Sequence, residues 1–208
     1  MAFPTTNATE ELPAINQILA SVGQAPVTTL DTTNPDVAIA YDTLLQVSRE
    51  VQAEGWAFNR EYEYKIITDS DKQYTIPNNV LQMDLSNISD NRNKDVVRRS
   101  GKLYDRHNHK YEISDAAGDT LKVDVVWKFD WVDLPVPIQD YITARASTFT
   151  ASRIVGDNSL VQMCARKEAT CRAAALEYDC NQGDYTYFGH PEGRNYYTSY
   201  QPYQALKR

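Results

Sequence analysis

A helical pair near the carboxyl end constrains the fold more than any other part of the sequence. It runs from Pro137 to about Asn181 and is broken at Gly156-Asp157-Asn158. At a rise of 1.5 Å per residue, a second helix from Ser159 to Asn181 is about 34 Å long. That is longer than most helices in globular proteins. Such a helix needs packing partners, and we expect them to be two helices at the other end of the chain.

Apolar side chains in the second helix recur at steps of three and four residues, which predicts one packing face. They are Leu160, Met163, Cys164, Cys171, Ala174, Ala175 and Tyr178. The first two of the three cysteines are seven residues apart, about 10.5 Å along the axis. A disulfide needs Cα atoms within about 7 Å. We therefore expect Cys164, Cys171 and Cys180 to be free thiols, buried in the core as small hydrophobic residues.

Two helices are predicted at the amino end. Pro13 suits the first turn of one helix, where its missing N–H needs no partner, and Gly23 suits the position just past its end. The second begins at Asn34-Pro35-Asp36, which combines an Asn cap, an early proline and an acid near the positive helix end. Gly55 closes it.

Between these helices the apolar spacing changes from the helical period to the strand period of two. Short turns are expected at Ser100-Gly101 and Asp115–Asp119, which favours an antiparallel sheet with one solvent-exposed face. The strand candidates are Tyr62–Ile66, Gln73–Ile76, Val80–Leu85, Val96–Arg99, Lys102–Asp105, Lys110–Ile113 and Leu121–Phe129.

This order of segments predicts an α+β protein in which a β domain is inserted into a helical bundle. Residues 1–55 and 133–181 supply the N-terminal and C-terminal helical parts of the bundle. Residues 56–132 form the antiparallel β domain, and residues 182–208 form an extended arm.

The arm is rich in tyrosine, and its glycines and prolines are not compatible with a helix. Tyrosine is enriched where one chain docks on another. We expect the arm to order on a partner, although folding back over its own sheet is the alternative. The candidate partner-binding residues are Tyr185, Tyr187, Tyr196, Tyr197, Tyr200 and Tyr203.

The net charge of −7 is unevenly distributed. Residues 1–55 contain one basic and seven acidic residues, for −6, residues 56–132 contain twelve and thirteen, for −1, and residues 133–208 contain eight of each. No basic stripe is present to bind DNA phosphates, so specific DNA binding is disfavoured, whereas an acidic channel would tolerate DNA. No apolar run reaches the ~20 residues of a membrane span, and the first residues lack the features of a secretory signal.

The sequence offers no chemistry that would indicate an enzyme or a cofactor. It contains neither a phosphate-binding glycine loop nor a nucleophile elbow. His107 and His109 lie at a predicted turn without a third metal ligand, and Glu61 and Glu63 are expected on the solvent-exposed face of a strand. We therefore expect no catalytic residues, no cofactor and no metal.

Aromatic residues mark both passages between helices and strands. Trp56 and Phe58 precede the sheet, and Trp127, Phe129 and Trp131 follow it at two-residue steps that predict one shared face. A sugar-binding cage is one interpretation. We prefer a seam where the sheet packs on the helices.

Five different short motifs follow one another over most of residues 10–180. They are Ile18–Gly23 followed by Pro26–Leu30, Gly55-Trp56-Ala57-Phe58-Asn59, Tyr104-Asp105-Arg106, and Ala144-Arg145-Ala146-Ser147 with Phe149. In these motifs the chain resembles the tail tubular protein A family, the head-to-tail adaptors of T7-like short-tailed bacteriophages.

The resemblance implies a structural protein of the virion tail that is present in the host cytoplasm during assembly. It implies a ring of twelve copies with the portal protein above, the tail nozzle (tubular B) protein below and DNA passing through. It implies no catalytic residues. The alternative is a carbohydrate-binding or glycan-degrading tail protein, and a completion protein of another tail type is a weaker one.

Overall fold

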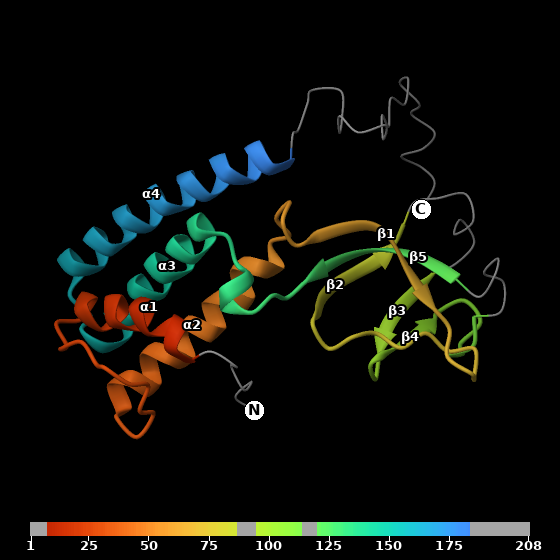
Figure 1. Ribbon diagram of the computed structural model, residues 1–208, viewed down its shortest axis with the longest axis horizontal. Helices are drawn as coiled ribbons and strands as arrows, with labels where there is room; N and C mark the ends of the chain where they lie inside the picture. Colours follow the sequence, from red (N-terminus) through yellow and green to blue (C-terminus); the bar gives the residue numbers. More distant parts are fainter. Residues whose placement is uncertain (1–7, 87–94, 114–119, 184–208) are drawn as a thin grey trace.

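The computed structural model describes residues 8–86, 95–113 and 120–183. Its helices lie at one end of an elongated molecule and its strands at the other (Figure 1), which confirms the predicted α+β class. In chain order the elements are α1 (Ala8–Ser21), α2 (Pro35–Ala53), β1 (Arg60–Ile67), β2 (Val80–Leu85), β3 (Val96–Arg99), β4 (Lys102–Asp105), β5 (Thr120–Trp127), the 3-10 turn η3 (Trp131–Asp133), α3 (Val136–Ile154) and α4 (Asn158–Gly183).

The helical part is built in layers around α3. Helices α1 and α2 pack on one side of α3, and α4 packs on the other (Figure 1). Burial of a large apolar side chain stabilises the fold by about 1.5–3 kcal/mol, so this core holds both ends of the chain together. Its fully buried members include Ile15, Ile18, Leu44, Val47, Ile138, Tyr141 and Ile142.

The start of α2 follows the prediction. The Asn34 side chain accepts a hydrogen bond from the Asp36 N–H at 3.1 Å, and Pro35 opens the helix. The prediction for Pro13 was wrong, since this proline lies inside α1, five residues after its first residue. Glu10 and Glu11 occupy the first turn of α1, where carboxylates offset the positive end of the helix dipole.

The break between α3 and α4 also lies where it was expected. Gly156 has φ of +68°, a conformation that glycine adopts without steric cost. The Asp157 carboxylate then accepts hydrogen bonds from the backbone N–H groups of Ser159 and Leu160 at 3.2 and 3.3 Å. The chain therefore reverses sharply, and α4 returns antiparallel to α3.

The apolar face predicted for α4 is only partly correct. Leu160, Cys164, Cys171 and Tyr178 are half-buried and Ala175 is fully buried. Two other predicted members are exposed, namely Met163 and Ala174. All three cysteines are free, as predicted, but none is buried, and Cys180 is exposed. The reason is that α4 packs against one neighbour, α3, so that a broad face remains in contact with solvent.

The described part of the β domain contains two small antiparallel sheets. In one, β5 lies between β1 and β2, and in the other β3 pairs with β4. The hairpin at Ser100-Gly101 forms as predicted, with φ of +52° and +75°. Gln73–Ile76 and Lys110–Ile113 are not strands, because each makes a single isolated bridge. The predicted turn Asp115–Asp119 lies outside the described residues.

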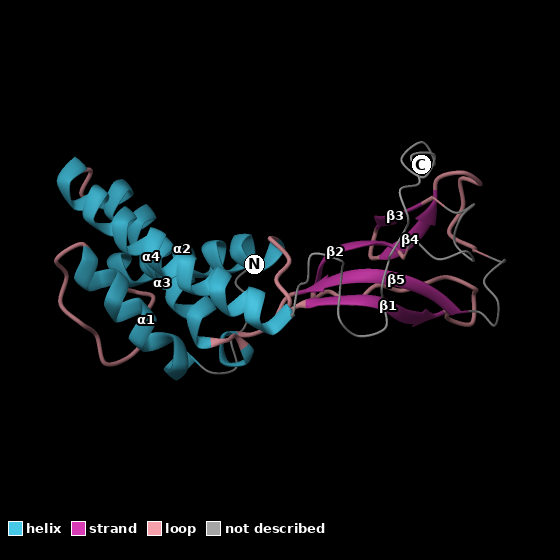
Figure 2. Cartoon of the chain, turned by 90° about the horizontal axis from the view of Figure 1, so that it is seen from above, coloured by secondary structure: helices cyan, strands magenta, loops and turns pink. Residues whose placement is uncertain are grey.

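The β domain has its own core, distinct from that of the helices. It is formed by one face of β5, which carries Leu121, Val123 and Val125, and by side chains such as Tyr74 and Leu103. The other face of β5 carries Lys122 and Asp124, which are half-buried, and Val126, which is buried, so the predicted solvent-exposed face is only partly correct. Viewed from above in Figure 2, the sheets extend away from the helices, so few elements connect the two parts. No described helix is long and apolar enough to cross a membrane.

Candidate assembly surfaces

The chain crosses between the helical part and the β domain twice, and buried amides join the two crossings. Gln52 and Asn59 are both fully buried. The Gln52 side chain donates to the Phe129 carbonyl at 3.2 Å and accepts from the Phe129 N–H at 2.7 Å. The Asn59 side chain donates to the carbonyls of Gln52 and Trp127 at 2.8 and 2.9 Å. The Asn59 bonds are buried and the Gln52 bonds are partly buried, so together they fix how the two parts meet.

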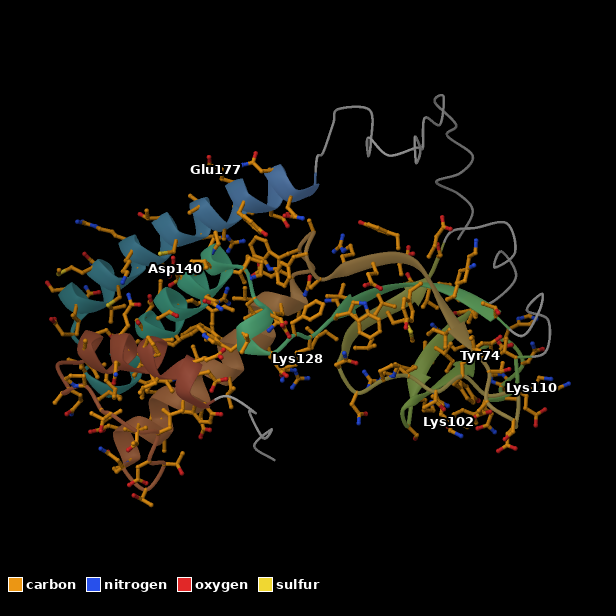
Figure 3. All side chains as sticks on the ribbon, viewed as in Figure 1. Tyr74, Lys102, Lys110, Lys128, Asp140 and Glu177 are labelled. Carbon is orange, nitrogen blue, oxygen red and sulfur yellow. The ribbon has the colours of Figure 1, made fainter. Side chains whose placement is uncertain are left out.

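Two further contacts strengthen the same junction. Asp179, near the end of α4, accepts a hydrogen bond from the Ala57 N–H at 2.6 Å. Gln82 of β2 donates to the carbonyl of Ala53 at 2.7 Å. The junction therefore connects α2, α4 and β2, and Lys128 marks its position in Figure 3.

Aromatic packing at the junction supports the predicted seam. Trp56 is buried in the helical core with its ring edge toward Tyr141, at 6.2 Å between centroids. Phe129 contacts both cores. The single shared face was a wrong prediction, because β5 ends at Trp127, which packs in the β core, whereas Trp131 packs on the helices. These rings therefore pack against side chains of the helical part and of the β domain, as a seam requires.

A charged cluster connects three helices. The Arg145 guanidinium on α3 lies 3.4 Å from carboxylate oxygens of both Glu50 on α2 and Glu54, which caps the end of α2, and it donates to the Tyr141 hydroxyl at 3.0 Å. Arg172 of α4 reaches Glu54 at 3.6 Å. Burial lowers the pKa of Arg145, but Tyr141 and Glu54 raise it more, so Arg145 remains charged. The cluster holds α2 and α4 against α3.

Among the described acidic residues of the segment 8–55, Glu11 is the buried one, with 3% of its surface exposed. Its Oε2 atom has no hydrogen-bond partner among the described residues. Burial raises the pKa of Glu11, while the hydrogen bond with Tyr41 lowers it by less. A buried carboxylate of this kind is costly when charged, and sequence alone gives no sign of it.

The outward faces of the helical part are open to solvent. On α4, Met163 is 68% exposed and Leu176 is 45% exposed, and Glu177 points away from the bundle (Figure 3). On α2, at the opposite side of the layers, Ile39 is 41% exposed. Exposed apolar side chains on two opposite faces are suited to contacts with other proteins.

The residues proposed from the sequence as partner-binding lie outside this geometry. The tyrosines Tyr185, Tyr187, Tyr196, Tyr197, Tyr200 and Tyr203 all fall in residues 184–208, beyond the described residues. His107 and His109 are exposed, and within residues 8–86, 95–113 and 120–183 no cluster of potential ligands could hold a metal ion.

Sequence reasoning missed Gln52 and Asn59, the residues that define the junction. Gln52 follows Ser48 and Val51 on the buried side of α2, and that position in the helical period is the one signal that indicated burial. Asn59 was noted as part of a motif, but one of its hydrogen bonds is to Trp127, 68 positions away in the sequence.

Comparisons with known proteins bear on what this architecture is for. A search of curated proteins finds no match. The family model described as tail tubular protein matches residues 12–185, a span that begins in α1, includes the whole β domain and continues past the end of α4. Since this match covers most of the sequence, the chain belongs to the tail tubular protein family and is a structural component of a phage tail.

Proposed function

We propose that the protein is the head-to-tail adaptor of a short-tailed phage and that twelve copies form a ring between the portal and the tail nozzle protein. The observation that carries this proposal is the layered helical part, which has outward faces on both sides of α3. A block with two opposite faces can repeat around an axis, each copy contacting the next. The family match supports the same role.

The charge distribution supports a DNA conduit. Residues 1–55 contribute −6 of the net charge of −7. If their side of the ring faces the lumen, the wall repels DNA phosphates and does not retain them. DNA then passes during ejection without specific binding.

The experiment is a measurement of native mass. The full chain is analysed by native mass spectrometry and light scattering, alone and after mixing with the portal protein. The adaptor proposal expects a closed assembly of twelve copies in at least one of the two samples. A chain that stays monomeric in both, with no bound portal, contradicts it.

The arm is assigned to portal binding in this proposal. Its tyrosines offer large contact area and polar hydroxyl groups at low entropic cost. A chain truncated after Gly183 is therefore expected to lose portal binding in a pull-down assay. A chain with Tyr62 and Tyr64 of β1 changed to Ala serves as a control for loss of exposed tyrosine elsewhere. If truncation leaves docking unchanged, the arm has another role.

A further inference from the structure

The outward face of α4 lacks a packing partner among the described residues. The helix is 26 residues long, and Ala175 is its single fully buried residue. Its amino-terminal half carries two adjacent exposed bases, Arg166 and Lys167, beside Met163, which is 68% exposed. No hydrogen bond or ion pair engages either basic side chain within the described part of the chain. This half of α4 is therefore a basic surface with an apolar residue at its edge.

The opposite side of the helical layers carries the complementary charge. There the outward face of α2 presents Asp42, which is exposed, and Asp36, which is half-buried, with Ile39 between them at 41% exposure. The exposed Asp31 precedes this helix, and Arg49 further along is the one base in residues 1–55. Thus the amino-terminal half of α2 is an acidic surface that also carries an apolar residue.

The two surfaces lie at the same end of the molecule. Arg153, near the end of α3, contacts Thr43 of α2, and α4 begins four residues after α3 ends. The amino-terminal halves of α2 and α4 are therefore both remote from the β domain (Figure 1). In a ring whose axis runs along the long axis of the molecule, surfaces at the same end of the molecule lie at equal height, so those of neighbouring copies can meet.

We infer that the basic half of α4, around Arg166 and Lys167, docks on the acidic half of α2, around Asp36 and Asp42, of a second copy of this chain. The contact pairs opposite charges and places Met163 near Ile39, the two exposed apolar residues of these surfaces. It is heterologous, because one copy uses its α4 face and the next uses its α2 face. This inference rests on the proposed ring and specifies how its subunits meet.

Charge complementarity favours a second copy over other occupants. DNA would be repelled by the acidic surface on α2. A single external partner of one charge would cover one of the two surfaces and leave the other open to solvent. A copy of the chain satisfies both at once. Glu50 and Glu54, the remaining acids of α2, already contact Arg145, so Asp36 and Asp42 are the acids of this helix that remain available.

Charge reversal tests the pairing in the full-length protein. In Arg166→Glu/Lys167→Glu both surfaces are acidic, and in Asp36→Lys/Asp42→Lys both are basic. Each variant is expected to need at least about tenfold more protein to assemble than wild type, by light scattering with and without portal. The variant that combines all four changes restores opposite charges and is expected to assemble as wild type does. Lys65→Glu/Lys110→Glu makes the same change in net charge as Arg166→Glu/Lys167→Glu, but at exposed positions of the β domain, and it serves as the matched control.

The outcomes separate this inference from the proposed function. If wild type and all variants remain monomeric, both fail. If wild type and Arg166→Glu/Lys167→Glu assemble alike, the ring stands and this interface is wrong, and α4 is covered by another occupant such as residues 184–208. If both reversals disrupt assembly but their combination does not restore it, the pairing of α4 with α2 is wrong. Recovery in the combined variant also shows that the substituted chain still folds.

Discussion

The Gln52 side chain and the Phe129 backbone exchange two hydrogen bonds, of 3.2 and 2.7 Å, where the helical part meets the β domain. The residues are 77 positions apart in the sequence, at opposite ends of the inserted domain. Through this pairing, both the N–H and the carbonyl of Phe129 have a hydrogen-bond partner. The side chain of one glutamine therefore fixes where the β domain lies against the helices.

We predict that Gln52→Ala lowers the free energy of unfolding by about 1–3 kcal/mol, because it removes both bonds and leaves the partly buried N–H and carbonyl of Phe129 unpaired. Urea denaturation followed by circular dichroism measures the change. The matched control is Gln46→Ala on the exposed side of the same helix, which is expected to cost less than about 0.5 kcal/mol. Equal effects of the two changes would refute the role given to Gln52.

Local signals in the sequence predicted some helix ends and one hairpin turn, although not the start of α1. Asn34 and Pro35 at the start of α2, Gly156 before α4 and Ser100-Gly101 in the hairpin act through their own backbone, so the neighbouring residues are enough to identify them. The period of apolar residues gave the α+β class for the same reason.

Contacts between distant residues were not predictable in this way. The central place of β5 depends on pairing with β1, about 60 residues earlier, and no local pattern encodes that order. Gln52, Asn59 and Glu11 are polar, so a single sequence assigns them to the surface, although tertiary packing buries all three. The exposure of Met163 arises because α4 has one neighbour, which its apolar spacing does not reveal.

The buried Glu11 gives stability an unusual dependence on pH. Because its pKa is raised in the folded protein, the contribution of this group is fully present below its unfolded pKa, about 4.3. That contribution is lost as pH rises through the higher folded pKa. Glu11→Gln is therefore expected to be more stable than wild type at pH 7, and the difference shrinks as pH falls toward 4.

Urea denaturation of both proteins from pH 4 to pH 8 measures this difference. Glu10→Gln is the control, since Glu10 is exposed in the same turn and its change is expected to stay within about 0.5 kcal/mol. A constant difference between Glu11→Gln and wild type at every pH would mean that the carboxylate is not the cause.

Two glycines with positive φ allow backbone strain to be separated from crowding. Gly23 has φ of +79° and open space where a Cβ would lie, whereas a Cβ on Gly55, with φ of +77°, would collide with the Arg60 guanidinium. Gly23→Ala is expected to cost about 1–2 kcal/mol from the left-handed backbone alone. Gly55→Ala should cost at least as much. If it costs more than Gly23→Ala, adding Arg60→Ala to the same chain should remove the difference, as measured by thermal denaturation. An excess that survives Arg60→Ala would argue against the collision.

Arg145 connects two acids of α2 to Tyr141, and its loss should loosen the helical layers. Arg145→Met keeps the aliphatic packing but removes the charge, and we expect a loss of about 1–3 kcal/mol because Glu50 and Glu54 are left without their shared partner. Arg153→Met is the control, since the contacts of Arg153 at 3.4 and 3.5 Å are to the neutral side chains of Thr43 and Gln46, so its loss leaves no carboxylate without a partner. Denaturation with guanidinium chloride measures the free energy of unfolding of both variants. A loss of stability in Arg145→Met no larger than that in Arg153→Met would contradict the prediction.

The three cysteines of α4 should react at different rates, because the helix exposes them unequally. Cys180 is exposed, whereas Cys164 and Cys171 are half-buried, and burial together with the charge of Asp140 raises the pKa of the Cys171 thiol. Since the thiolate is the reactive form, maleimide at pH 7 is expected to label Cys180 first and Cys171 last, as measured by peptide mass mapping over time. In urea the three rates should converge. If Cys171 reacts as fast as Cys180 in the folded protein, α4 does not pack on α3 as described.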